Sequence, residues 1–435
     1  VYMNINQQLF DFIQKSPSPF HAIQTISQQL EQQGFQKLHE HESWKLQPEG
    51  KYYVTRNRSS IVAFALPKEQ FQGFLITSSH SDCPTFKVKN GAELEAAGIY
   101  TVLNTEGYGG MLRSTWLDKP LGIAGRVVVE TETGVETRLV TLDPLRLVIP
   151  NLAIHMDREV NNGKTYKLQS DMLPLFGNKD TKGQFGQLVA KAAGVQPEQV
   201  LGNELYLYNP QEGQLVGAEQ EYLLCPRLDD LECAFGTLQG FLQGAPKKNV
   251  NVFVVLDNEE VGCSTKQGAD SNFMASVLER ICSCMGKTRE GYFAALSSSM
   301  MISADNAHAV HPAYAGKSDP VTKTQMNEGV VVKSNASQLY TTDAVSAALL
   351  KKIAAKAGVK LQWFVNNSDV RGGSTLGNIS STQAAINTVD VGLPQLAMHS
   401  SCETAGSKDL QALVDLCKEF YSGSLSVQED GNWTV

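Results

Sequence analysis

The sequence predicts an α/β fold: a mostly parallel, mixed sheet flanked by helices, with a strand-rich region inserted into it. Strands and helices alternate in the first part of the chain and again after Leu228, the order typical of a sheet sandwiched between helices. Over residues 88–215, glycines instead punctuate short β-type runs, and the main helical pattern spans Phe185–Ala193. We therefore expect a discontinuous domain, residues 1–87 and 216–435, and an inserted domain, residues 88–215.

Hydrophobic periodicity places the individual elements. Apolar residues at helical spacing predict helices over residues 5–14, 22–33, 231–242, 272–285 and 344–357, and over a final stripe that includes Leu410, Leu413 and Cys417. Runs rich in β-branched and aromatic residues predict strands at 52–55, 60–66, 74–77, 126–130, 138–142, 145–149, 250–256, 300–303, 361–365, 388–391 and 396–398.

Composition restricts the classes of function. A net charge of −8 argues against a general nucleic-acid binder, which needs a basic face. No apolar run reaches the roughly 18 residues of a membrane span, and residues 1–15 lack the features of a secretory signal. The eight cysteines are scattered, as in reduced cytosolic proteins, and none is at metal-finger spacing. We expect a cytoplasmic protein with no nucleic-acid or membrane partner.

Metal-binding residue types recur where predicted strands end or helices begin, the edge at which α/β sheets bind ligands. His80 and Asp82 follow one strand, Asp229 opens a helix, and Asp305 and His399 each follow an apolar run. A carboxylate two residues after a histidine can orient a metal-binding imidazole. Taken singly, these residues also suit helix caps, surface pairs or structural histidines.

The pair Glu259-Glu260 is the most informative of these positions. It follows the apolar strand at residues 250–256, where two adjacent glutamates are costly to desolvate unless a cation compensates them. A metal would bind one glutamate and leave the other to take a proton from water. A solvated loop is the alternative. Together the segments supply ligands for two zinc ions about 3.5 Å apart.

The order of these segments resembles the aspartyl aminopeptidase family of co-catalytic zinc metallopeptidases. The resemblance covers nearly the whole chain and includes the segments Ser-Ala-Asp at 303–305 with His308, Ala-Met-His-Ser at 397–400, and Ile-Pro-Asn-Leu-Ala-Ile-His at 149–155. It implies an aminopeptidase with a zinc-peptidase sandwich, an inserted dimerisation domain and a homo-oligomeric dodecamer acting on peptides. Manganese or cobalt would suit the same donors.

The resemblance also implies a role for each residue. Asp229 would bridge both metals, with His80 and Asp305 completing one site and Glu260 and His399 the other. Glu259 would be the catalytic base, and Asp82 would orient His80. His155 would reach a neighbouring subunit's active site, although its apolar surroundings alone suit a core histidine.

Lys333 would recognise an acidic side chain of the substrate, although from its own sequence context it would be an ordinary solvated lysine. The sequence departs from the family pattern at Leu339, where an arginine is common, and in the loop at residues 371–377. These departures favour neutral specificity as an alternative. Three further alternatives concern the function itself. They are a related dizinc family that also forms tetrahedral shells, dizinc deacylases and carboxypeptidases with a differently placed insertion, and a non-catalytic scaffold.

Overall fold

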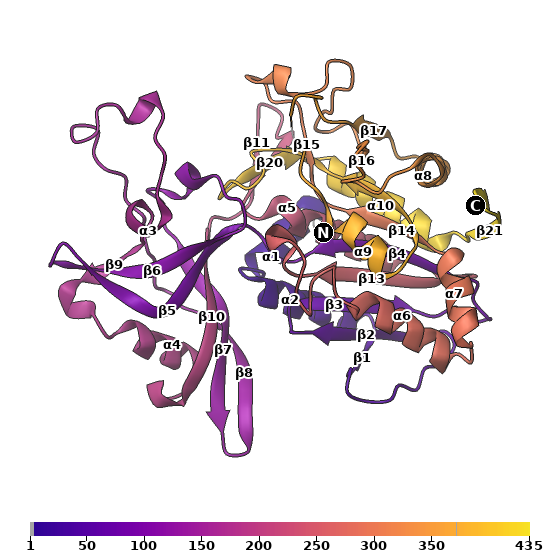
Figure 1. Ribbon diagram of the computed structural model, residues 1–435, viewed down its shortest axis with the longest axis horizontal. Helices are drawn as coiled ribbons and strands as arrows, with labels where there is room; N and C mark the ends of the chain where they lie inside the picture. The colour runs from indigo at the N-terminus through magenta and orange to yellow at the C-terminus, as the bar shows by residue number, and fades with distance from the viewer. Residues whose placement is uncertain (1–3, 371) are drawn as a thin grey trace.

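A nine-stranded mixed sheet forms the centre of the larger domain in the computed structural model, which describes residues 4–370 and 372–435 (Figure 1). Five of its strand pairs are parallel, and strands β13, β4, β14 and β18 lie side by side in parallel. The strands in spatial order are β1 (Gln36–Leu38), β2 (Lys51–Arg56), β3 (Ser60–Ala65), β13 (Val250–Leu256), β4 (Phe74–His80), β14 (Met300–Ala304), β18 (Asn387–Gly392), β16 (Val330–Lys333) and β17 (Leu361–Phe364).

Both faces of this sheet are buried, because alternate residues of each strand point to opposite sides. In β13, Phe253 packs with one helical layer and Val252 and Val254 with the other, and all three are fully buried. Full burial of such a side chain contributes about 1.5–3 kcal/mol. The first layer contains α1 (Ile5–Gln14), α2 (Pro19–Gln32), α5 (Leu228–Gln243), α8 (Ala344–Ala357) and α10 (Asp409–Ser422), and the second contains α6 (Phe273–Cys284), α7 (Arg289–Ser297) and α9 (Leu376–Gln383).

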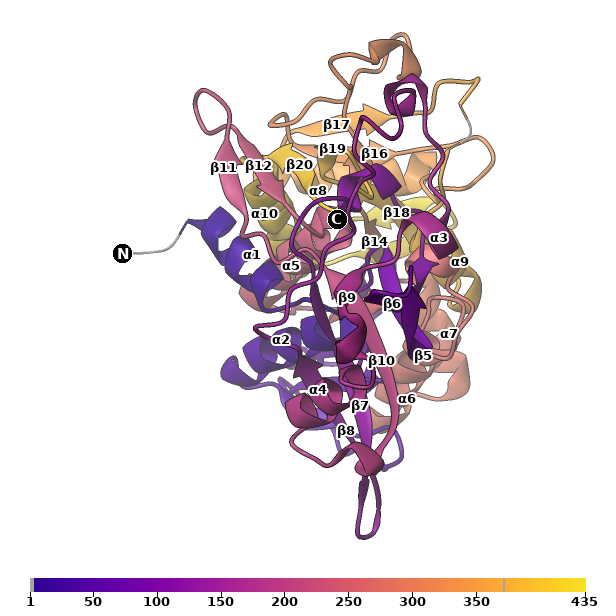
Figure 2. The ribbon, with the colours of Figure 1, turned by 90° about the vertical axis from the view of Figure 1, so that its left-hand side faces the viewer.

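A six-stranded sheet with its own hydrophobic core lies beside the larger domain (Figures 1 and 2). Its strands in spatial order are β8 (Gly134–Thr141), β7 (Gly122–Thr131), β10 (Val200–Tyr208), β5 (Thr85–Ala96), β6 (Tyr100–Tyr108) and β9 (Leu175–Asn178). The helices of this region are α3 (Leu168–Asp171), α4 (Phe185–Ala193) and the 3₁₀ turns η1 (Arg113–Trp116), η2 (Val160–Asn162), η3 (Lys179–Thr181) and η4 (Pro197–Gln199). The β7–β8 hairpin projects at the bottom of both views.

A smaller five-stranded sheet, formed by segments that are distant in sequence, lies above the central sheet in Figure 1. Its order is β11 (Gln214–Val216), β12 (Tyr222–Cys225), β20 (Glu403–Gly406), β19 (Pro394–Leu396) and β15 (Ala307–His308). Short pieces η5 (Glu259–Val261) and η6 (Ala315–Lys317) and a terminal hairpin of β21 (Ser426–Glu429) and β22 (Asn432–Thr434) complete the structure. The turn between β19 and β20 contains His399, so this sheet positions that residue.

Most expected elements form, and several have the predicted bounds, including α1, α4, α8 and β13. The strand expected at residues 145–149 is wrong, because Leu147 and Val148 make only isolated bridges to Leu121 and Leu175. The strand expected at residues 396–398 lies earlier, at Pro394–Leu396, and a turn follows it. No helix in the described ranges has the length and apolarity needed to cross a membrane.

Candidate metal centre

The carboxyl ends of adjacent parallel strands bring the predicted metal ligands together. His80 is the last residue of β4 and lies opposite Leu256, the last residue of β13, three residues before Glu259. Asp305 directly follows β14, the other neighbour of β4. This is the edge of an α/β sheet at which ligands bind.

Asp229, in the first turn of α5, lies between two groups of side chains. Its Oδ1 is 3.4 Å from His80 Nε2, and its Oδ2 is 3.4 Å from His399 Nε2. His399 Nε2 is also 3.3 Å from Glu260 Oε1. The ligand atoms of His80, Asp229 and Asp305 form one compact group, and those of Asp229, Glu260 and His399 form another; those of His80, Glu259 and Glu260 also lie close enough to share an ion. One carboxylate therefore belongs to both.

The donor set fits metal ions of the zinc type. Within each group, the candidate ligand atoms lie within 4.8 Å of one another. Asp229 Oδ1 and Glu260 Oε1 are buried and accept no hydrogen bond from the described residues. Buried carboxylate oxygens without a partner are costly, and a cation between imidazole and carboxylate donors removes that cost.

Asp82 hydrogen-bonds to residues of both groups. Its backbone carbonyl accepts a hydrogen bond from His80 Nδ1 at 3.0 Å, and its Oδ1 lies 3.4 Å from the same nitrogen. The carboxylate also accepts the backbone N–H groups of Glu259 at 3.1 Å and Glu260 at 3.2 Å. Asp82 thus contacts both the His80 ring and the backbone of the glutamate pair.

Two further acidic residues belong to the site and were not predicted. Asp230 is fully buried and accepts the backbone N–H of His80, and its carboxylate joins the His80 group. Glu403 is buried and accepts the backbone N–H groups of Asp229 at 3.0 Å and His399 at 2.8 Å. Their proximity in sequence to Asp229 and His399 is the one signal that could have identified them.

The crowding of carboxylates shifts the acidity of the site. Burial raises the pKa of Glu259 to about 8, and the charges of Asp305, Asp82 and Asp229 add to the effect against the opposing charge of His80. Burial would lower the pKa of His399, but the hydrogen bond to Asp229 and the charge of Glu260 outweigh it and raise the pKa to about 10. The site concentrates negative charge that holds protons, and metal cations can neutralise that charge in their place.

A cavity of about 290 Å³ opens onto this cluster, with Glu259, Asp305 and His399 in its walls. Lys333 also lines it and is buried, with 3% of its side chain exposed, so its interpretation as a solvated lysine is wrong. Its Nζ donates to the backbone oxygens of Asp305 at 2.8 Å and Asn306 at 3.1 Å, and lies 3.7 Å from Asp305 Oδ1.

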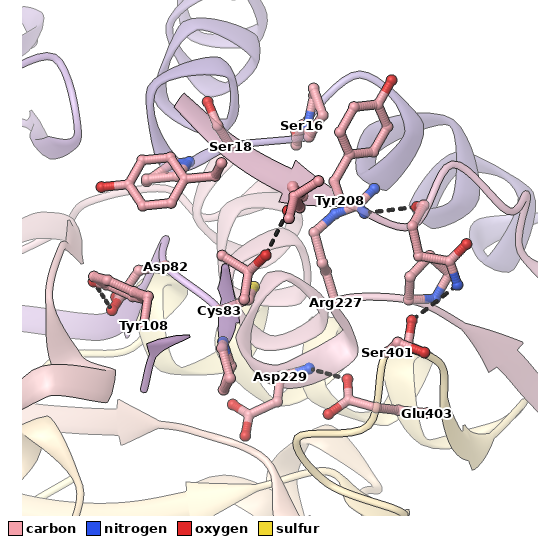
Figure 3. A pocket seen from close by; sticks show the side chains of 18 of the residues that line it. Ser16, Ser18, Asp82, Cys83, Tyr108, Tyr208, Arg227, Asp229, Ser401 and Glu403 are labelled. Carbon is pink, nitrogen blue, oxygen red and sulfur yellow. Dashed lines mark hydrogen bonds between the residues drawn. The ribbon is translucent and has the colours of Figure 1, made fainter. Parts of the chain in front are cut away.

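A second pocket, which shares Asp229 with this cavity, is shown in Figure 3. Asp82, Asp229 and Glu403 contribute to its walls, together with Tyr108 and Arg227. In this view the hydroxyl of Tyr108 points to Asp82, and the backbone of Asp229 points to Glu403.

His155 does not join the cluster. It is exposed, in the long loop between β8 and α3, so its interpretation as a core histidine is wrong. Leu152, Ile154 and Met156 in the same loop are exposed as well. Of the two sequence departures, Leu339 lines a neighbouring cavity, and Arg371 lies outside the described residues.

Comparison with known proteins decides the family. Residues 12–421 match the family described as "Aminopeptidase I zinc metalloprotease (M18)". The chain belongs to the M18 family. It is therefore a zinc metallo-aminopeptidase, and its resemblance to the aspartyl aminopeptidases is confirmed.

Relatives in the M18 family match over almost their full length. The "Probable M18 family aminopeptidase 2" of Clostridium novyi (strain NT) is 45% identical over 423 residues, which are 95% of this chain and 98% of the relative. The solved structure "Cryo-EM structure of the Ape4 and Nbr1 complex" is 34% identical with a TM-score of 0.92, covering 96% of this chain and 85% of that chain. "Structure of S. cerevesiae mApe1 dodecamer" is 28% identical with a TM-score of 0.84, covering 96% of each chain. These M18 structures confirm the predicted fold class.

Proposed function

We propose that this M18 aminopeptidase removes N-terminal residues from peptides with two zinc ions per chain and Glu259 as the general base. The observation that supports two ions is the position of Asp229, whose two oxygens each face a different histidine at 3.4 Å. His80 and Asp305 would complete one site, and Glu260 and His399 the other. When bound, the ions lower the pKa of water and polarise the peptide carbonyl.

The residues around the cavity would divide the remaining work. Glu259 lies at the cavity wall, and its carboxylate accepts no hydrogen bond among the described residues. It would take the proton of the attacking water and deliver it to the leaving amine. Burial raises the pKa of Glu259 in the metal-free chain to about 8, and the charge of bound cations would lower it, so the carboxylate could take a proton near neutral pH.

The variant Glu259→Gln tests the base. Proton transfer by a positioned side chain contributes about 10²–10⁴-fold, so turnover should fall by at least two orders of magnitude. Zinc content, measured by elemental analysis, should stay at the wild-type value because Glu259 is not one of the proposed ligands. Glu290→Gln, at an exposed glutamate in α7, is the matched control. Near wild-type turnover in Glu259→Gln would show that another group is the base.

We also propose a preference for Asp and Glu at the peptide N-terminus, with Lys333 as the recognising cation. Lys333 lies in the wall of the cavity, where burial would lower its pKa, but the charges of Asp305 and Asp390 outweigh burial and hold the pKa above the ordinary value. An ammonium that stays charged there would favour a carboxylate.

A panel of aminoacyl substrates (Asp, Glu, Leu, Ala, Lys) tests this preference, each with and without a chelator. Chelator-sensitive cleavage of Asp and Glu substrates that Lys333→Met selectively loses would support the proposal. Chelator-sensitive cleavage that favours Leu or Ala would keep the aminopeptidase and establish the neutral alternative. Absence of cleavage with zinc restored would favour the scaffold.

For assembly and location, we propose a cytoplasmic homo-oligomer, a dodecamer built from dimers. In it, residues 88–215 would dimerise and His155 would reach a neighbouring subunit's cavity. The exposure of His155 and of the apolar side chains beside it supports this arrangement. Mass measured in solution and the activity of His155→Ala test the two parts separately.

A further inference from the structure

The segment that leaves the six-stranded sheet touches both groups of proposed metal ligands. Residues 108–115, called here the clamp segment, comprise the end of β6, a short link and most of η1. They come from the inserted region, yet they contact the residues that orient His80 and the turn that contains His399.

At the His80 group, the contact is made by Tyr108 through Asp82. The Tyr108 hydroxyl donates to Asp82 Oδ2 at 2.6 Å and accepts from Asn258 Nδ2 at 2.9 Å. The amide oxygen of Asn258 is itself fixed by Thr265 and Gln267. Asp82, whose carbonyl binds the His80 ring, is thus held from the opposite side by the inserted sheet.

At the His399 group, the contact runs along the backbone. His399 Nδ1 lies 2.7 Å from the carbonyl oxygen of Gly110, and Leu112 donates its N–H to the carbonyl of His399 at 3.0 Å. Two residues further, Ser401 donates its N–H to Thr115 Oγ1 at 2.9 Å and its hydroxyl to the Thr115 carbonyl at 2.6 Å. The turn is therefore bound to the clamp segment at His399 itself and at Ser401.

These contacts determine which ring nitrogen can bind a metal. A carbonyl oxygen only accepts, so Nδ1 of His80 and of His399 must each carry the hydrogen. Nε2 of each ring, which faces Asp229, is then the nitrogen left to bind a metal once it has given up any proton of its own. Close approach is possible because residue 109 is glycine, with φ of +71° and only 3.1 Å between a hypothetical Cβ and Glu260 Cβ.

We infer that the clamp segment positions both metal sites and couples the inserted sheet to them, a role that rests on the proposed two-zinc function. Tyr108 is the positioning residue for the His80 ion, and Thr115 is the one for the His399 ion. Groups that orient a metal-bound histidine typically change metal affinity by about 10- to 100-fold when they are removed.

Zinc titration of the full-length, chelator-stripped chain, in competition with a chromogenic chelator, tests the inference without reference to activity. Tyr108→Phe and Thr115→Val should each weaken one of the two binding steps by about 10- to 100-fold, and the double variant should weaken both. Tyr206→Phe and Ser114→Ala are matched controls. Tyr206 packs 5.6 Å from the Tyr108 ring, Ser114 is exposed beside Thr115, and neither side chain hydrogen-bonds to a described residue.

The result separates this inference from the function on which it rests. Two zinc ions bound at wild-type affinity by both variants would overturn the inference alone, as would equal weakening in the two controls. A wild-type chain that binds a single zinc would overturn the two-zinc function together with the inference. Metal-free unfolding midpoints are measured alongside, since a merely structural role would lower the midpoint without selecting one binding step.

Discussion

The substitution Asp82→Asn separates the orienting role of this residue from a general effect on charge. Three donors converge on its carboxylate: the Tyr108 hydroxyl and the backbone N–H groups of Glu259 and Glu260. Asparagine keeps one oxygen and replaces the other with an NH₂ group. If the NH₂ group takes the place of Oδ1, the Glu259 N–H faces a donor, and if it takes the place of Oδ2, the Tyr108 hydroxyl and the Glu260 N–H do.

The magnitude follows from the one or two lost contacts. A hydrogen bond to a charged group contributes about 1.5–3 kcal/mol, so the loss amounts to about 1.5–6 kcal/mol before the site relaxes. A weakening of zinc binding by about 10- to 100-fold accounts for about 1.4–2.7 kcal/mol of this. The remainder should appear as lower stability of the metal-free protein.

Two assays on the same preparation measure both parts of the effect. Urea unfolding of the metal-free protein gives the stability, and zinc titration against a chelator gives the affinity. Asp118→Asn, at an exposed aspartate that accepts two hydrogen bonds from Asn151, is the control and should change neither. Wild-type zinc affinity together with wild-type stability in Asp82→Asn would refute the view that Asp82 orients the site.

Two further predictions concern the core and the pH dependence of the metal site. Tyr421→Phe should lower the free energy of unfolding by about 2–5 kcal/mol in urea, because the buried Thr77 N–H and Val252 oxygen lose their partner; a loss below about 0.5 kcal/mol would contradict this. Zinc affinity should rise between pH 6 and 9, by about tenfold per unit for each proton released, since metal-free His399 with a pKa of about 10 holds a proton that zinc must displace. Titrations at several pH values measure the slope, and a flat or falling affinity would count against His399 as a ligand.

Local patterns were enough to predict most of the central domain. The run at residues 250–256 is β-branched and apolar because both of its faces are covered, and the strand forms with those bounds. The run at residues 145–149 is also mostly apolar but pairs only through isolated bridges, so composition alone did not distinguish it from a strand. Strand pairing depends on partners distant in sequence, which periodicity does not identify.

The same limit applies to the site. His80, Asp229, Glu260, Asp305 and His399 were recognisable because each combines a ligand chemistry with a strand end or helix start, and the structure places them together. Tyr108 and Glu403 were not: Tyr108 binds Asp82 from the inserted sheet, and Glu403 binds Asp229 across 174 residues, with only its place four residues after His399 as a signal. Lys333 could be located, but its burial against Asp305 could not be derived from its neighbours in sequence.

The wide separation of these ligands along the chain also links zinc supply to the lifetime of the folded protein. Residues from 80 to 399 converge on the two groups, so the ligand sets exist only after the central sheet and the β19–β20 turn have formed. Any ion bound there acts as a ligand of the native state alone. Free zinc at about 1,000 times its dissociation constant would add about 4 kcal/mol per independent site to the free energy of unfolding. A chelator would therefore stop catalysis at once and, more slowly, increase the fraction of chains open to proteolysis.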